Sequence, residues 1–388
     1  MGMSKSIYLY SILFFIFLYP FSITLANEDG ASANYLFLIF PFLIIFYNKK
    51  IIKPHFYWNL YIIIYLLILF ISIFYQIDFI KYLERRLISF ILFMAIFAFL
   101  FIRIDNKMFV SFKNSLIIIS LFFSLVTLYK FITLGASDLG FDAKGEVGSQ
   151  RFGFVYVLSI WVLIYDKNYH KLKKFMLIFI ILLGLLLTFS RSGIVAMLVT
   201  FFLVLLSSII KWFKRPNLKG FYIGLIIILF FIFTLIFINY KYPIIFDFFY
   251  QRLFSYFEKG GTSQIDLDQD TSEGYRVFLL KKVINFVLFN PLTGSGFLGV
   301  WIMFDDQSGS AHGQFVDVFF RTGFIGLILY LIILVKILNY FLKFHIGFFW
   351  GIIGVIVYGF FHETFKLSQG TFILAFLIGI TSQNKIVK

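Results

Sequence analysis

Long apolar runs, separated by short polar connections, recur along almost the whole chain. An α-helix needs about 20 apolar residues to cross the hydrocarbon core of a bilayer, and many of the runs reach that length. A helix in lipid satisfies its own backbone hydrogen bonds, so each run predicts a membrane-spanning helix. We expect about twelve such helices, at residues 6–26, 33–47, 56–75, 87–102, 112–134, 152–165, 175–189, 193–210, 221–239, 312–335, 346–362 and 369–382. The predicted fold class is an all-α polytopic membrane protein, with residues 1–388 forming a single transmembrane domain.

The composition agrees with this pattern. Hydrophobic residues make up 61% of the chain and charged residues 14%, and the mean hydropathy is +0.94. Soluble globular proteins are about half apolar and about a quarter charged. The chain contains no cysteine, which excludes disulfide and thiol chemistry. In the first run, Lys5 and the sequence Thr24-Leu25-Ala26 also fit a secretory signal with its cleavage site, so this span has an alternative interpretation.

The distribution of charge predicts the orientation in the membrane. Lys and Arg gather on every second connection: Lys5; Lys49, Lys50 and Lys53; Arg103, Lys107 and Lys113; Lys167, Lys171, Lys173 and Lys174; Lys211, Lys214, Arg215 and Lys219; Lys336 and Lys343; Lys385 and Lys388. Basic connections face the cytoplasm, so both termini are expected there. Of the acidic residues only Asp105 and Asp166 fall on that side, although the outer connection at 76–86 carries Lys81, Arg85 and Arg86 against the trend. The net charge of +15 therefore reflects membrane orientation, and we expect no nucleic-acid partner.

A long outer connection, residues 240–311, separates the ninth and tenth predicted spans. Its first part, Gly260 to Glu273, is polar and acidic. The part from Glu273 to Phe289 has apolar residues at helical spacing, namely Val277, Leu280, Ile284 and Val287. We predict an amphipathic helix here, lying on the outer face of the membrane.

Three glycines follow this helix and spell GxGxxG at Gly294, Gly296 and Gly299. A dinucleotide-binding fingerprint needs a preceding strand and a following helix in a βαβ unit, and neither is expected here. The glycines instead predict a tight turn that lets the backbone approach the membrane or a substrate closely.

Polar side chains are expected at one depth near the outer leaflet. They are Arg151 before the sixth span, Ser190 and Arg191 in the hairpin between the seventh and eighth spans, Arg276 in the amphipathic helix, His312 and Arg321 in the tenth span, and His362 and Glu363 at the end of the eleventh. Each has a simpler interpretation as well. An interfacial arginine such as Arg151 often extends to lipid headgroups, His362 could be solvated or cap a helix, and Glu363 and Asp317 could pair with Lys366 or Arg321.

Several arginines near the outer leaflet suit an anionic ligand carried by a lipid, because guanidinium binds phosphate in a bidentate manner and keeps its charge. Arginines can neutralise a diphosphate leaving group without a metal ion. A nearby histidine can accept a proton from an attacking hydroxyl group. Asp266 and Asp268 have the spacing of a metal-binding DxD motif but lie in the acidic stretch, so no metal and no cofactor is expected.

Four sequence motifs follow one another along the chain in this order: TFSRSG, an Arg-containing helix, NPLTGSGFLG, and AHGQFVDVFFRTGFIGLILYL. This order resembles that of the O-antigen polymerase and O-antigen ligase superfamily of bacterial inner membranes. The resemblance covers residues 148–335 in detail and the first half of the chain only in topology. It implies a metal-independent glycosyltransferase that acts on undecaprenyl-diphosphate-linked glycans, as donor and acceptor, at the periplasmic face.

The resemblance also implies roles for individual residues. Arg191 and Arg276 match arginines that contact the diphosphate, and His312 matches a histidine that activates or orients the acceptor hydroxyl. Arg151 matches a less regular arginine of the family, and we expect it in a substrate-binding set with Ser190, Arg321, His362 and Glu363. Many members, the ligases especially, have Asn directly after this histidine. Here the residue is Gly313, which disfavours the ligase and leaves the role of the histidine open.

The predicted function is that of an O-antigen polymerase, which would work in the inner membrane among membrane lipids and beside a chain-length regulator protein. The alternative is an O-antigen ligase, which transfers the glycan to lipid A-core. A flippase or transporter of lipid-linked sugars is a further alternative, but such proteins usually show internal repeats or helices broken near the midplane, and neither is visible in the sequence. The last alternative is a purely structural subunit of an envelope assembly.

Overall fold

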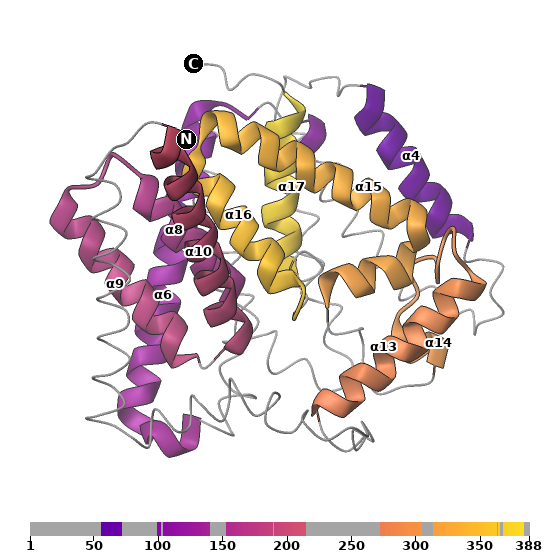
Figure 1. Ribbon diagram of the computed structural model, residues 1–388, viewed down its shortest axis with the longest axis horizontal. Helices are drawn as coiled ribbons and strands as arrows, with labels where there is room; N and C mark the ends of the chain where they lie inside the picture. The colour runs from indigo at the N-terminus through magenta and orange to yellow at the C-terminus, as the bar shows by residue number, and fades with distance from the viewer. Residues whose placement is uncertain are drawn as a thin grey trace.

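The computed structural model describes residues 56–71, 99–101, 104–139, 153–188, 190–214, 272–304, 313–362, 364 and 368–383. Every regular element in these ranges is a helix, which confirms the all-α class for this part of the chain (Figure 1). The helices are α4 (Phe56–Ile71), α6 (Asn106–Leu139), α8 (Gly153–Tyr165), α9 (Lys171–Leu187), α10 (Arg191–Lys214), α13 (Ser272–Phe289), α14 (Val300–Phe304), α15 (Gln314–Phe344), α16 (Ile346–Gly359) and α17 (Ser368–Ser382).

Three of these helices are long and apolar enough to cross a membrane: Asn106–Thr133, Ser192–Ile210 and Gln314–Phe344. Shorter apolar helices occur at Trp58–Ile68, Gly153–Tyr165, Ile346–Gly359 and Gly370–Ser382. Together with α9 they correspond to eight of the predicted spans. The predicted spans at 6–26, 33–47 and 221–239, and nearly all of 87–102, lie outside the described residues, so the total of about twelve remains a prediction.

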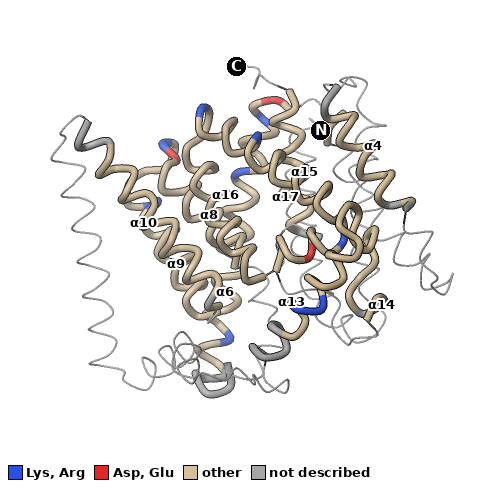
Figure 2. The backbone as a smooth tube through the Cα atoms, turned by 45° about the vertical axis from the view of Figure 1, so that its right-hand side comes forward, with Lys and Arg blue, Asp and Glu red and all other residues tan. Residues whose placement is uncertain are grey.

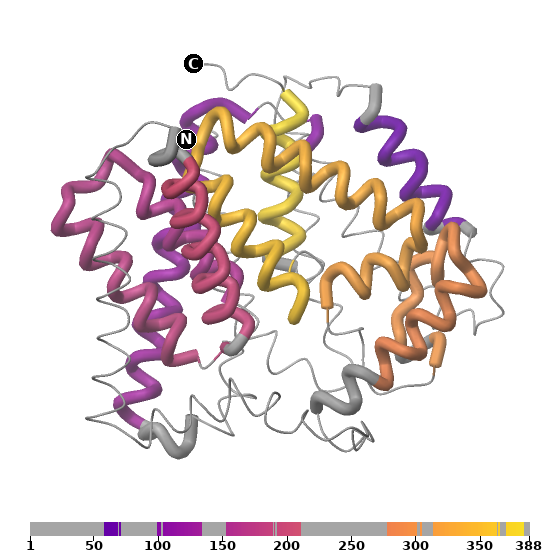
Figure 3. The backbone as a smooth tube through the Cα atoms, viewed as in Figure 1, coloured from indigo at the N-terminus to yellow at the C-terminus, as the bar shows by residue number. Residues whose placement is uncertain are grey.

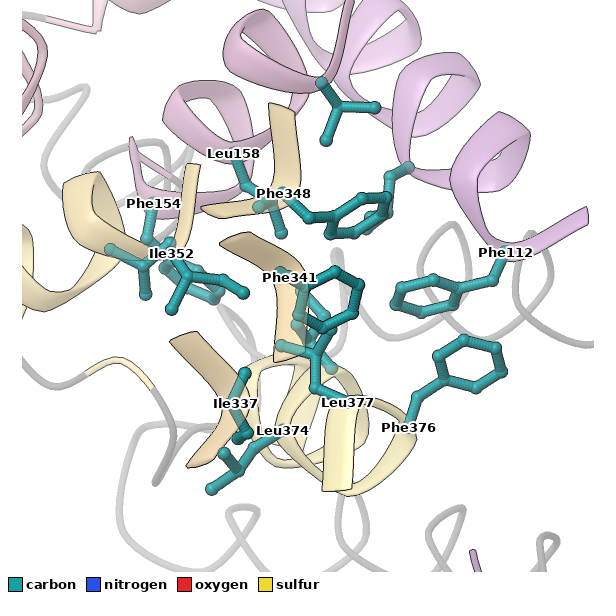
Figure 4. Close-up of a cluster of buried hydrophobic side chains, with 14 of the residues drawn as sticks. Phe112, Phe154, Leu158, Ile337, Phe341, Phe348, Ile352, Leu374, Phe376 and Leu377 are labelled. Carbon is teal, nitrogen blue, oxygen red and sulfur yellow. The ribbon is translucent and has the colours of Figure 1, made fainter. Parts of the chain in front are cut away.

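Helices α8 and α16 pack against each other at the centre of the bundle, with α6, α9 and α10 on one side and α4, α15 and α17 on the other (Figure 1). Small residues allow the close approach: a Cβ atom added at Gly354 of α16 would lie 2.4 Å from Cγ1 of Val157 in α8. Such small residues are typical of helix contacts in membranes. Next to this contact the core is aromatic (Figure 4), and the rings of Phe112 and Phe376 stack with centroids 3.9 Å apart.

Lysines lie where α8 meets α9, at the start of α6 and at the end of α15 (Figure 2). A buried ion pair joins two of these parts, because Lys113 of α6 donates a hydrogen bond to Asp166 after α8. The backbone amide of Asn168 donates to the same carboxylate at 2.9 Å. Burial alone would raise the pKa of Asp166, but the hydrogen bonds from Lys113 and Asn168 lower it below its ordinary value.

His345, between α15 and α16, belongs to the same end, and its Nδ1 atom accepts a hydrogen bond from the amide of Phe348. Burial lowers the pKa of His345, and the charge of Lys113 lowers it further. The folded protein therefore holds this imidazole neutral at a pH where the unfolded chain protonates it. Stability is complete above the ordinary pKa of about 6.5 and falls as the pH drops from there toward the folded pKa.

The variant His345→Asn keeps a capping acceptor but cannot titrate. Between about pH 7.5 and pH 5.5 it should lose less stability than the parent. Thermal unfolding in detergent at the two pH values measures the difference. His170→Asn is the matched control, because His170 is an exposed residue at the start of α9 that makes no side-chain capping hydrogen bond. Equal losses in His345→Asn and the parent would contradict the assignment.

Candidate functional site

The hairpin between α9 and α10 is held by its own hydroxyl groups, at the end of α9 opposite the lysine-rich connection. Ser190 is buried and precedes the first residue of α10, and its Oγ atom accepts a hydrogen bond from the amide of Gly193 at 3.3 Å. The same oxygen lies 3.1 Å from Oγ of Ser192. Ser190 therefore caps the start of α10. The sequence predicted only a substrate-binding role for this residue. Arg191 begins α10, and its side chain lies outside the described residues.

Helix α15 is broken at Gly323, whose backbone has φ 62° and ψ −162°. The first half, residues 314–322, turns sharply into the second half beside α13 (Figure 3). The predicted uninterrupted span at 312–335 is wrong in this respect, and a broken helix is present that the sequence did not reveal. The break leaves backbone groups on both sides of Gly323 that a continuous helix would have paired internally.

A turn at residues 291–299, here called the glycine turn, supplies partners for four of these groups. The amides of Ser295 and Phe297 donate to the carbonyls of Phe320 and Arg321, in that order, both at 2.8 Å. In the other direction, the amide of Phe324 donates to the carbonyl of Pro291 at 2.8 Å, and the amide of Ile325 donates to that of Leu292 at 3.4 Å. Gly294 has φ +56°, and a Cβ atom there would lie 2.2 Å from the carbonyl oxygen of Phe320. The predicted tight turn is thus confirmed, and the backbone that it approaches is that of α15.

Arg321 adds a side-chain connection across the same joint. Its Nε atom donates to Oδ2 of Asp317 at 2.7 Å, and its Nη1 atom donates to the carbonyl oxygen of Phe297 at 2.9 Å. Asp317 and Arg321 are one helical turn apart and form an ion pair, as the simpler interpretation of Asp317 predicted. Substrate binding by Arg321 is untested.

The start of α15 lies against the turn that follows α16. Oε1 of Gln314 accepts hydrogen bonds from the amide and the hydroxyl of Thr364, at 3.0 and 3.5 Å. A Cβ atom on Gly313 would lie 3.2 Å from the carbonyl oxygen of Phe360. In this turn the ring centroid of His362 is 5.5 Å from that of Tyr358. Chain segments 50 residues apart are thereby brought together. His312, Glu363 and Arg151 lie outside the described residues.

The sequence model of a protein family described as O-antigen ligase matches residues 176–331. The predicted family resemblance is confirmed over this segment. It runs from α9 through the hairpin, α10, α13 and the glycine turn to the second half of α15. Members of the family are glycosyltransferase-like enzymes that act on lipid-linked glycans, and the match together with the apolar helices indicates a multi-pass membrane protein. A comparison with curated proteins found no match.

Within the matched residues 176–331, α13 confirms the helix predicted at 273–289, but the predicted apolar stripe is divided between two sides of that helix. Leu279, Val283 and Val287 are buried against Phe320 of α15. Leu280, Ile284 and Leu288 lie on the adjacent side of the helix and are exposed. The apolar residues therefore occupy two faces, and the predicted stripe mixed members of both. Arg276 lies near the start of α13, and its side chain is outside the described part.

A residue that was not predicted for the site also contacts the matched segment, residues 176–331. Tyr65 of α4 donates from its hydroxyl to the carbonyl oxygen of Gly326 at 3.3 Å, just after the break in α15. Its ring lies 5.7 Å from that of Phe297 in the glycine turn. The sequence does contain a signal for this contact. Tyr61 and Tyr65 lie one turn apart in a predicted span, and a buried tyrosine hydroxyl usually has a hydrogen-bond partner.

Proposed function

We propose that this protein is an O-antigen polymerase, which joins undecaprenyl-diphosphate-linked repeat units into polysaccharide at the periplasmic face of the bacterial inner membrane. One observation carries the proposal. The segment that matches the O-antigen ligase family contains the hairpin of Arg191, the helix of Arg276 and the first half of α15, which begins two residues after His312. The hairpin and the start of α15 lie at the ends of their helices opposite the lysine-rich connections, where the site was expected.

In the proposed reaction Arg191 and Arg276 bind the diphosphate of the donor. His312 accepts the proton of an acceptor hydroxyl on a second lipid-linked repeat unit. The hydroxyl oxygen attacks the anomeric carbon of the donor, the bond from that carbon to the phosphate oxygen breaks, and undecaprenyl diphosphate leaves with the electron pair. The two guanidinium groups stabilise the charge that develops on the leaving group. His312 then releases its proton to solvent.

The exposed face of α13 supports a location next to lipid. Leu280, Ile284 and Leu288 form an apolar stripe on this face, and Phe289 continues it at the end of the helix. The neighbouring side, with Leu279, Val283 and Val287, is covered by α15. We propose that the stripe lies in the outer leaflet, which would hold Arg276 at the depth of lipid phosphates.

An O-antigen ligase, with lipid A-core as the acceptor, is the second candidate. The description of the matching family favours it, whereas Gly313 in the place of the usual Asn favours the polymerase. Both use the same donor chemistry and differ in the acceptor. The polymerase would work with a chain-length regulator protein, and that partner follows only from the family.

A gel of lipopolysaccharide from a deletion strain of the native host separates the candidates. If the chain is the polymerase, we expect cores that each carry a single repeat unit, and the ladder should return when the intact gene is restored. Bare cores with accumulated lipid-linked polymer would identify the ligase. An unchanged ladder would reject both. Purified protein that moves lipid-linked repeat units across liposomes without lengthening them would identify a transporter.

A further inference from the structure

Arg321 was expected to bind substrate, but its contacts indicate a different role. We infer that Arg321 is a positioning residue. Together with Asp317 and the carbonyl group of Phe297 it forms a connection, here called the Arg321 bridge, that holds the glycine turn on the broken start of α15. The inference rests on the proposed function, because the elements joined in this way carry Arg276 and lead to His312.

The first argument is electrostatic. The carboxylate of Asp317 is only 3% exposed and accepts from Nε of Arg321. An opposite charge at this distance offsets the field of the guanidinium, so Arg321 attracts a diphosphate less than an arginine without such a partner. Its Nη1 atom donates to a protein carbonyl. The protein itself thus binds two of the nitrogen atoms of the rigid guanidinium group, Nε and Nη1.

The second argument concerns the backbone that the bridge holds. Phe297 has φ 72° and is the one non-glycine residue with positive φ in the described part of the chain. The left-handed region is unfavourable for a residue with a Cβ atom, so it persists only where the surroundings impose it. The hydrogen bond from Arg321 to the Phe297 carbonyl and the contact of the Phe297 ring with Tyr65 are surroundings of this kind.

The third argument is the set of elements that the bridge connects. Phe320, next to Arg321, packs on Leu279 and Val283 of α13. The first half of α15 begins at Gln314 and is fixed there to Thr364. Helix α13, the glycine turn and this half-helix therefore form one packed group. Loss of the bridge should allow α13 and the glycine turn to move relative to α15, which would change the distance between the two sides of the proposed site, Arg276 on α13 and His312 just before α15.

The movement can be measured directly, because the chain has no cysteine of its own. Nitroxide labels at Asn285→Cys on α13 and Ile328→Cys on the second half of α15, both exposed, report the distance between the two elements by pulsed electron paramagnetic resonance. We expect a narrow distance distribution in the parent and a broader one in Arg321→Ala and Asp317→Ala. Arg321→Lys should also broaden it, since one ammonium group cannot reproduce both fixed contacts of the guanidinium. Lys343→Ala, at the exposed far end of α15, is the control and should leave it unchanged.

Kinetics supply the second measurement. A positioning role predicts that Arg321→Ala lowers kcat roughly 10- to 100-fold while the KM for the lipid-linked donor changes by less than about twofold. A rise in KM with an unchanged distance distribution would overturn the inference and make Arg321 a contact of the diphosphate. If Arg321→Ala does not fold, Arg321→Lys and Asp317→Asn test the same two readouts. An unchanged distribution in every folded variant would also overturn the inference. If the parent has no polymerase activity but its Arg321 variants still broaden the distance distribution, the proposed function is rejected and the positioning role of Arg321 stands.

Discussion

Replacement of His312 by alanine is expected to abolish polymerisation while binding of the lipid-linked donor remains measurable. In the proposed reaction His312 acts on the acceptor hydroxyl, and the donor diphosphate is bound by arginines. Loss of a general base typically lowers the rate by about 10²- to 10⁴-fold. The purified protein in nanodiscs, supplied with lipid-linked repeat units, allows both quantities to be measured: polymer length on a gel and donor affinity by fluorescence titration.

Arg191→Lys provides the matched comparison for this experiment. It keeps the positive charge and loses the bidentate fork, so donor affinity and activity should fall together. His170→Ala serves as the control, because His170 is exposed in the connection between α8 and α9 at the opposite end. If His312→Ala also loses donor binding, His312 contacts the donor and is not the base. Normal activity of Arg191→Lys would count against diphosphate binding by Arg191.

Gly294→Ala is expected to have the largest effect on stability. An alanine at φ +56° costs about 1–2 kcal/mol from its backbone conformation alone. Its Cβ atom would also lie 2.2 Å from the carbonyl oxygen of Phe320, which cannot move away without breaking the hydrogen bond from Ser295. A lost buried hydrogen bond adds about 1–3 kcal/mol, so the total loss is on the order of 3 kcal/mol.

Thermal unfolding in detergent and the yield of folded protein measure this loss. Leu292→Ala is the control on the same turn, because the Leu292 side chain is 63% exposed and its deletion leaves the backbone contacts in place. We expect the control to unfold close to the parent temperature. A Gly294→Ala protein as stable as the parent would mean that the glycine turn does not need its close approach to α15.

The sequence predicted those features that depend on local pattern. The apolar run at 152–165 gave α8 almost to the residue, because the polar stretch from Asp166 ends it. The pair of Asp317 and Arg321 followed from spacing within one helix. The break at Gly323 could not be predicted, since glycine is common in membrane helices and its effect here depends on a turn that lies some 30 residues earlier in the chain.

Other features required contacts between distant segments. Apolar residues on two sides of α13 did not show which of them would meet α15, so the predicted stripe combined buried Val287 with exposed Leu280 and Ile284. The hydrogen bonds from Thr364 to Gln314 join segments that no local pattern relates. For the candidate site, the sequence identified the hairpin at Ser190 and the region of His312 as polar ends of spans, but the capping role of Ser190 appears only in the structure.

The joint between the glycine turn and α15 has a consequence for how such a sequence can evolve. The four hydrogen bonds that join the glycine turn to the backbone of the broken helix run from main chain to main chain. Most side chains along the joint can therefore be exchanged without loss of these bonds, provided that the glycines with positive φ and the Arg321 bridge remain. Substitutions can in this way alter the side chains that surround the joint, while the main-chain architecture beneath them stays the same.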